Sequence, residues 1–180
     1  MMKPVLIIIL CAISIHALAD NRPSNDCIEL AHVDYSKAFN EYWNLIDKEF
    51  ESRSPKLYPE FSYLIKEQLN SSKMHEIKLS YFLKYHPDKL DLDKEIFRVM
   101  PSAANYSNEY FREIRKIPEY DQLYLENYSY RHNIKMPNYE KLQTVSQLLS
   151  DIKSKASILA FQHVIMKKAS KPVMELDCDS

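Results

Sequence analysis

Thirteen of the 180 residues are tyrosine, and five of these recur at intervals of four. Tyr120, Tyr124 and Tyr128 form one series, and Tyr106 and Tyr110 form another. Residues four apart share a face of an α-helix, so each series predicts a tyrosine-lined helical face. Tyrosine combines a large rigid ring with a polar hydroxyl and is enriched at the centres of protein interfaces. We expect these five tyrosines to form a partner-binding surface, with half-buried packing in the core as the alternative.

Clustered carboxylates could bind a metal ion. The densest acidic run comprises Asp88, Asp91, Asp93 and Glu95, which offer oxygen ligands of the kind that calcium prefers. The run lacks the sharp turn and the distal bidentate glutamate of a calcium loop, and its intervening leucines suit the start of a helix. The histidines show no metal-ligand spacing. We therefore expect no metal site and no cofactor.

No serine or cysteine stands out as a nucleophile, so we expect no catalytic residue. A carboxylate pair such as Glu60 and Glu67 could carry glycosidic chemistry if the fold brought the two side chains together. An all-helical enzyme with its active site in a crevice of the bundle is therefore the enzymatic alternative.

A short segment at the end of a predicted helix has the sharpest local motif, with the sequence Lys84-Tyr85-His86-Pro87-Asp88-Lys89. It resembles the His-Pro-Asp loop of J-domain co-chaperones, in which the tripeptide lies between two antiparallel helices and engages an Hsp70. The preceding Glu76-Ile77-Lys78 and Tyr81 resemble the basic helix before that loop. The resemblance implies that His86, Pro87 and Asp88 bind a partner, but it fails downstream, where Pro101 interrupts the expected second helix. A helix-ending turn is the alternative.

The N-terminus predicts export. Lys3 precedes an apolar run from Val5 to Ile15, and Ala17-Leu18-Ala19 fits the small-x-small rule for signal peptidase. We expect residues 1–19 to be a cleaved signal peptide and residues 20–180 to be a single domain in the periplasm or outside the cell. The apolar run is too short for a membrane span of about 20 residues, so we expect no membrane insertion of the mature chain.

Cleavage would remove Cys11 and leave Cys27 and Cys178 near the two ends of the domain. In an oxidising compartment we expect these two to form a disulfide, with two free thiols or a covalent dimer as the alternatives. Asn70, Asn105 and Asn127 each begin an Asn-x-Ser pattern, which would be glycosylated only in a eukaryotic source.

The composition excludes several classes of function. The chain contains no glycine, and the phosphate-binding loop, the dinucleotide-binding turn, the nucleophile elbow and the EF-hand all depend on glycine. Tight β-hairpins also favour glycine, which argues against a β-rich fold. The formal net charge is −1, so the chain lacks the basic character of a nucleic-acid-binding protein.

The longest periodic segment lies near the C-terminus. Its apolar spacing alternates three and four from residue 138 to about residue 170, which predicts one long helix with a single apolar seam. The same heptad seam, from 142 to 166, could serve a homodimer. We expect the histidine of this seam, His163, to be a hydrogen-bonded core residue. The seam residues are Leu142, Val145, Leu149, Ile152, Ala156, Leu159, His163 and Met166.

Shorter helical patterns, separated by prolines and polar capping residues, precede this segment. We expect caps at Asn25 or Asp26, again at Asp34, and at Asn70-Ser71-Ser72, with Pro118 opening a further helix. The predicted fold is all-α, with six or seven short helices packed around one long C-terminal helix. Trp43 is expected to anchor the core.

These features favour an exported, non-enzymatic binding module whose tyrosine-rich face docks another exported protein. Inhibitors and immunity proteins that block a toxin or a cell-wall enzyme are examples of this class. The helical enzyme and the J-domain-like co-chaperone are the alternatives.

Overall fold

The computed structural model describes residues 22–100, 107–133 and 139–178, and regular structure in these ranges is helical. The described residues contain no strand, only an isolated bridge between Glu95 and Pro172. The all-α prediction is therefore confirmed. The α-helices are α1 (Asn25–Arg53), α2 (Tyr58–Phe61), α3 (Tyr63–Tyr85), α4 (Asn108–Ile114), α5 (Pro118–Asn133), α6 (Tyr139–Lys153) and α7 (Ala156–Ala169), and the 3₁₀ turns are η1 (Pro87–Lys89), η2 (Ile96–Arg98) and η4 (Val173–Glu175).

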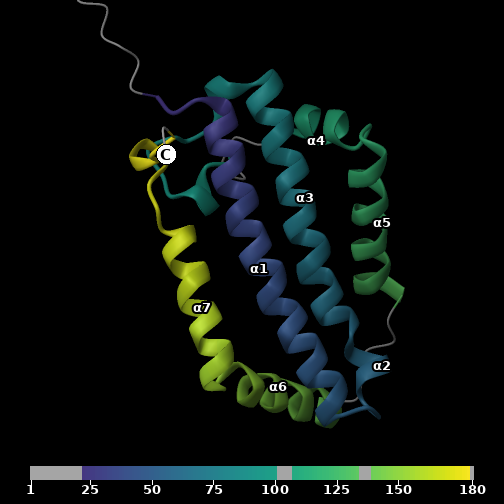
Figure 1. Cartoon of the computed structure of the whole chain (residues 1–180). Helices are drawn as coiled ribbons and strands as arrows, with labels where there is room; N and C mark the ends of the chain where they lie inside the picture. Colours follow the sequence, from purple (N-terminus) through teal and green to yellow (C-terminus); the bar gives the residue numbers. More distant parts are fainter. Residues whose placement is uncertain (1–21, 101–106, 134–138, 179–180) are drawn as a thin grey trace, which may run out of the picture.

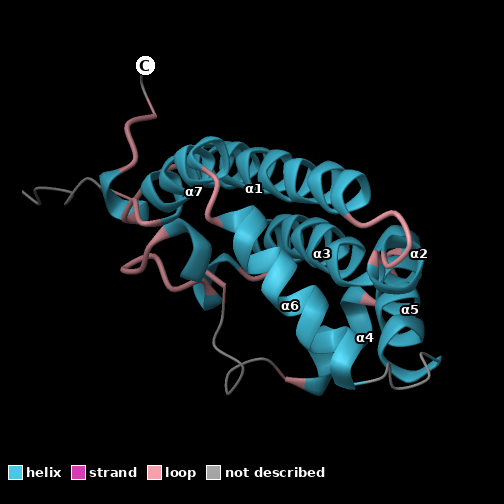
Figure 2. Cartoon of the chain, turned by 90° about the horizontal axis from the view of Figure 1, so that it is seen from below, coloured by secondary structure: helices cyan, strands magenta, loops and turns pink. Residues whose placement is uncertain are grey.

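Four helices lie side by side in the order α7, α1, α3, α5, so α1 and α3 each have a helix on both sides (Figure 1). Helix α6 crosses the row at the end where α1 finishes, as the view from below also shows (Figure 2). Helix α4 lies at the opposite end, near α3 and α5. Helix α5 is thus an edge helix, and its contacts are mainly with α3.

Helix α1 is the longest helix, with 29 residues, because nothing in its sequence stops it before Ser54. Ser24 caps it by accepting a hydrogen bond from the Cys27 N–H at 3.2 Å, so the predicted caps at Asn25 and Asp26 are one or two residues late. The predicted second cap at Asp34 is wrong. The Asp34 carboxylate pairs with Lys168 of α7 and leaves the backbone helical.

The prediction of one long C-terminal helix is also wrong, because the segment breaks between α6 and α7. The Ser154 hydroxyl donates to the Asp151 carbonyl at 2.7 Å, and Lys155 adopts an extended conformation. A serine hydroxyl that bonds a nearby carbonyl competes with the helical ladder. Ion pairs from Lys155 to Glu49 and from Lys168 to Asp34 then hold α7 along α1 at both of its ends.

The break moves the apolar seam to a different face. In α6 the predicted seam residues Val145 and Ile152 are buried, but in α7 the buried residues are Ile158, Ile165 and Ala169. The predicted seam positions in α7 are exposed, so the expectation that His163 lies in the core is wrong. Only the α7 half of the 142–166 seam is free for a second copy, and the homodimer stays a prediction. The exposed α7 seam residues are Ala156, Leu159, His163 and Met166.

The hydrophobic core forms two clusters. The first includes Ile28, Phe82 and Tyr120, from α1, α3 and α5, and the second includes Ile46 and Val145, from α1 and α6. Between the clusters, the buried positions of α1 are His32 and Ser36, and α3 contributes Ser71, Ser72 and His75 on the facing side. We call these five residues the polar band. Trp43 lies at the second cluster, half-buried under Lys153.

The two ends of the domain are joined as predicted. Cys27 at the start of α1 and Cys178 form a disulfide, with Cα atoms 5.6 Å apart and a separation of 151 positions in the sequence. Near it, the Ile96 N–H donates to the Lys171 carbonyl, and the Val173 N–H donates to the Lys94 carbonyl. A disulfide indicates an oxidising location. No helix in the described ranges combines the length and hydropathy needed to cross a membrane, and the predicted signal peptide lies outside those ranges.

Candidate functional site

A groove of about 500 Å³ runs between α3 and α5 and is the candidate site. Helix α5 supplies one wall, α3 supplies the other, and α4 contributes Phe111. We call it the α3–α5 groove. Its lining residues are Ser71, Met74, His75, Lys78, Phe111, Tyr120, Tyr124, Asn127, Tyr128, Arg131 and His132.

The predicted tyrosine series of α5 lines this groove but becomes more exposed along the helix. Tyr120 is only 1% exposed and belongs to the first core cluster, with the Lys78 ammonium 5.7 Å from its ring centroid. Tyr124 is half-buried, with Phe111 edge-on at 5.4 Å and the Arg115 guanidinium 4.5 Å from its ring centroid. The series therefore serves as core at one end and as surface at the other.

Tyr128 is the tyrosine of this series that offers its ring to solvent, because it is 50% exposed. The His132 imidazole stacks on it at a centroid distance of 3.8 Å, and His132 Nδ1 lies 2.9 Å from the Tyr128 carbonyl oxygen. This stack makes a flat aromatic surface at the edge of the groove.

A polar network fixes α5 against α3. The Asn70 amide donates to Asn127 Oδ1 at 3.1 Å and to Glu126 Oε2 at 3.1 Å, and the Asn127 amide donates to Ser71 Oγ at 3.3 Å. Because Asn70 bonds α5 in this way, the predicted cap at Asn70-Ser71-Ser72 is wrong and α3 continues through it. Asn127 is buried and the Asn70 amide is engaged, so a glycan on either side chain would disrupt this network.

The groove carries positive and aromatic groups without a carboxylate among its lining residues. Its cationic side chains are Lys78 and Arg131, and its histidines are His75 and His132. The pKa of Lys78 is lowered by burial, and the pKa of His75 is lowered by burial and by the nearby Lys78 charge. The Arg131 guanidinium also pairs with Glu67, whose carboxylate lies outside the lining.

Tyr110, from the second tyrosine series, does not line the groove. Tyr110 packs instead among the aromatic side chains at the end of α3, 4.7 Å from the His86 ring and 5.3 Å from the Phe82 ring between centroids. Tyr106 lies outside the described residues. Among the described residues, Tyr110 therefore lies apart from the groove that Tyr120, Tyr124 and Tyr128 line.

The His86-Pro87-Asp88 segment ends α3 and is followed by the 3₁₀ turn η1. His86 is half-buried, and its Nε2 lies 3.3 Å from the Tyr81 hydroxyl. Residues 90–100 contain only η2 as regular structure, so an antiparallel second helix does not follow the tripeptide there. The resemblance to a J-domain thus extends to the end of one helix and not to the helical hairpin.

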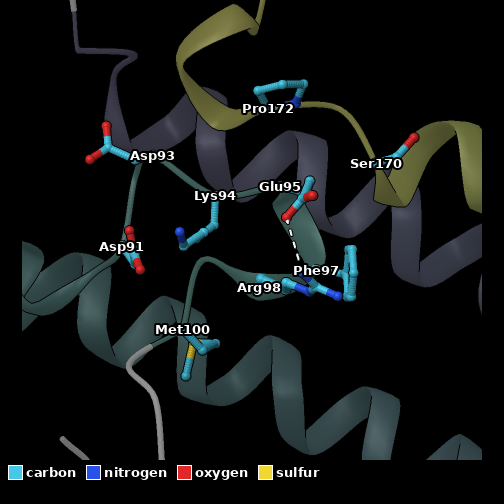
Figure 3. A pocket seen from close by; sticks show the side chains of 9 residues that line it. All are labelled: Asp91, Asp93, Lys94, Glu95, Phe97, Arg98, Met100, Ser170 and Pro172. Carbon is cyan, nitrogen blue, oxygen red and sulfur yellow. Dashed lines mark ion pairs between the residues drawn. The ribbon is translucent and has the colours of Figure 1, made fainter.

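The acidic run partly lines an open pocket of about 630 Å³, drawn in Figure 3. Asp91, Asp93 and Glu95 lie there among Lys94 and Arg98, and Glu95 pairs with Arg98 at 3.9 Å. The described residues contain no group of three or more His, Cys, Asp or Glu side chains arranged to hold a metal ion. The helix start that the leucines of this run suggested is only the 3₁₀ turn η2 in the structure, and Lys94 and Ile96 bond the segment around Pro172 through their backbones.

The two carboxylates considered for glycosidic chemistry, Glu60 and Glu67, each bond a cationic side chain. Glu60 accepts a hydrogen bond from Lys141 at 2.7 Å, and Glu67 pairs with Arg131. Each carboxylate therefore has its own cation.

Sequence reasoning missed the pairing of His32 with His75. Their rings are nearly parallel, with centroids 6.1 Å apart and an interplanar angle of 8°. Burial and the neighbouring His75 lower the pKa of His32 to about 4. The available signal was the interruption of two apolar helical stripes by His32 and Ser36 on one helix and by Ser72 and His75 on the other.

No protein-family model, curated protein or solved structure matches this chain.

Proposed function

We propose that this protein is an exported, non-enzymatic binding protein whose α3–α5 groove receives an acidic segment of another exported protein. Inhibition or neutralisation of that partner, as by an inhibitor or immunity protein, is the role that this proposal favours. The disulfide between Cys27 and Cys178 and the predicted signal peptide support export.

The charge of the groove carries the proposal. Lys78 and Arg131 line it together with three tyrosines, and none of its lining residues is acidic, although Glu67 beside the groove pairs with Arg131. The nearby carboxylates of α5 are occupied by groups outside the lining. Asp121 binds Arg115 at 2.6 Å, and Glu126 accepts from Gln122 and Asn70. A partner that brings carboxylates and apolar side chains would complement both features of the groove.

The exposed end of the groove suits a protein partner. Tyrosine and arginine are enriched among the residues that dominate binding energy, and the stacked Tyr128 and His132 rings offer a flat aromatic surface that a partner can cover. Helix α5 lies at the edge of the helical row, so a partner can approach it without displacing another described helix.

Affinity capture with matched variants tests this proposal. The baits are oxidised residues 20–180 as wild type, Tyr128→Glu and Tyr85→Glu, incubated with a native envelope or secreted extract at low salt. Tyr85 is a fair control because it is 57% exposed, close to the 50% of Tyr128, and lies outside the groove. Circular dichroism first confirms that both variants fold.

A partner that binds the groove should be retained by wild type and by Tyr85→Glu, and its affinity for Tyr128→Glu should fall at least about tenfold. Its retention should also weaken as salt rises from about 0.05 to 0.5 M, because exposed charges are screened. Equal retention by both variants would refute the assignment of the groove.

A further inference from the structure

A second cavity, of about 240 Å³, lies between α1 and α3 and is bordered by Phe97 of η2. It occupies the polar band between the two core clusters, and it shares Ser71 and His75 with the α3–α5 groove. We call it the histidine cavity. Its lining residues are His32, Tyr35, Ser36, Phe39, Gln68, Ser71, Ser72, His75 and Phe97.

His32 gives this cavity an unsatisfied hydrogen-bonding atom. The residue is only 1% exposed, and its Nδ1 lies 3.4 Å from the Ser36 hydroxyl. Its Nε2 is fully buried and has no hydrogen-bond partner in the protein. Buried polar atoms in native proteins are nearly always paired with protein groups or ordered water, so this nitrogen at the cavity wall is available to bond a molecule held in the cavity.

The lining keeps its titratable groups neutral at pH 7. Burial lowers the pKa values of His32 and His75, and burial raises the pKa of Tyr35. The other lining residues are serine, glutamine and phenylalanine, which carry no charge. An ion placed here would lose its hydration without gaining a counter-charge, so the expected occupant is neutral.

The volume and the lining of the cavity further restrict the class of molecule that can bind. A cavity of about 150 Å³ lined by apolar side chains can bind benzene, so 240 Å³ accommodates a single ring with a polar substituent. Phe39, Phe97 and Tyr35 offer aromatic surfaces to such a ring. The lining also contains hydrogen-bonding groups, namely the hydroxyls of Ser71 and Ser72 and the amide of Gln68.

We propose that the histidine cavity binds a small neutral aromatic molecule of the phenol class, with its hydroxyl hydrogen-bonded to Nε2 of His32. This site is separate from the protein-docking role of the groove, since it lies on the other side of α3. The two sites lie on opposite sides of α3 and have Ser71 and His75 in common.

Titration of the oxidised wild-type protein with phenol and with toluene tests the proposal, because the two probes have similar shapes and only phenol has a hydroxyl. Histidine ring resonances, observed by NMR in protein labelled with ¹⁵N-histidine, report where each probe binds. Phenol should shift the His32 and His75 signals saturably and should bind about fivefold more tightly than toluene, the expected value for one hydrogen bond.

The matched variants are His32→Phe, which removes Nε2, and His163→Phe, which alters an exposed histidine of α7. His32→Phe should lose about fivefold in phenol affinity and keep its toluene affinity, whereas His163→Phe should match wild type. Undiminished phenol binding by His32→Phe would overturn the proposal. If that variant does not fold, the wild-type titration decides, and equal affinities for the two probes or no saturable shift at His32 would overturn it.

Discussion

Lowering the pH from 7 to 5 should destabilise the folded protein through His32. This histidine is buried in the polar band and has a folded-state pKa of about 4, against 6.5 for an unperturbed histidine. The unfolded chain therefore binds a proton at a higher pH than the folded chain does. The contribution of neutral His32 to the free energy of unfolding is greatest above pH 6.5, decreases as the pH falls, and is lost below pH 4. The titratable groups that face His32 are His75 and Tyr35, so no neighbouring carboxylate in the lining offsets the loss.

The size of the effect follows from the two pKa values. Linkage gives a loss of about 2 kcal/mol in the free energy of unfolding between pH 7 and pH 5, and about 3 kcal/mol once the pH is below 4. The lowered pKa of His75 adds to the loss in the same direction. With a urea m-value of about 2 kcal/mol per M, His32 alone should lower the unfolding midpoint by about 1 M between pH 7 and pH 5.

Urea unfolding of wild type and His32→Phe at pH 7, 6 and 5, followed by circular dichroism, measures this contribution. The phenyl ring is close to imidazole in size and does not titrate, so the difference between the two pH dependences isolates His32. The variant should be less sensitive to pH by about 2 kcal/mol over this range. Parallel pH dependences would show that His32 does not stay neutral in the folded protein, and the reasoning would fail.

Three further perturbations test the fold. Cys27→Ser breaks the disulfide to Cys178 and should lower the free energy of unfolding by about 2–4 kcal/mol in denaturant titrations under oxidising conditions; no change would mean that the bridge is not formed. Ile46→Ala should cost about 3 kcal/mol because Ile46 is fully buried, whereas Leu30→Ala, at a side chain 70% exposed, should cost under about 0.5 kcal/mol. Asn127→Ala should cost about 1–2 kcal/mol by leaving buried partners on α3 unpaired, and an unchanged melting temperature would argue against the network that fixes α5.

Local signals predicted the parts of this fold that local chemistry decides. The absence of glycine favoured helices, Pro118 does open α5, and Cys27 and Cys178 do join the ends. Each of these outcomes depends on a residue's own backbone preference or on the small number of available partners.

The errors came from positions where tertiary contacts outweigh local preference. Asp34 and Asn70 can both cap helices, yet each bonds a neighbouring helix and leaves its own helix unbroken. Helix α7 has apolar side chains on several faces, so periodicity alone could not decide whether Ile158 or Leu159 faces the core. The break at Ser154 depends on the hydrogen bond from its hydroxyl to the Asp151 carbonyl. The heptad spacing of the apolar residues carries no information about that bond.

The candidate site was predicted only in part for the same reason. The series from Tyr120 to Tyr128 indicated one face of α5 correctly, since all three tyrosines line the groove. The opposite wall, with His75 and Lys78, comes from α3 and is more than forty residues earlier in the chain. No spacing rule links the two walls, because packing between α3 and α5 brings them together.

The most direct test of the central claim is site-specific photocrosslinking in the native envelope or secreted extract. A photoreactive amino acid replaces Tyr128 in one protein and Tyr85 in another, and adducts are identified by mass spectrometry. If the groove binds a partner, position 128 should give one discrete adduct and position 85 should give none. The crosslinked peptide of the partner should be rich in Asp or Glu. Equal crosslinking from both positions, or no adduct from position 128, would contradict the assignment of the α3–α5 groove as the docking surface.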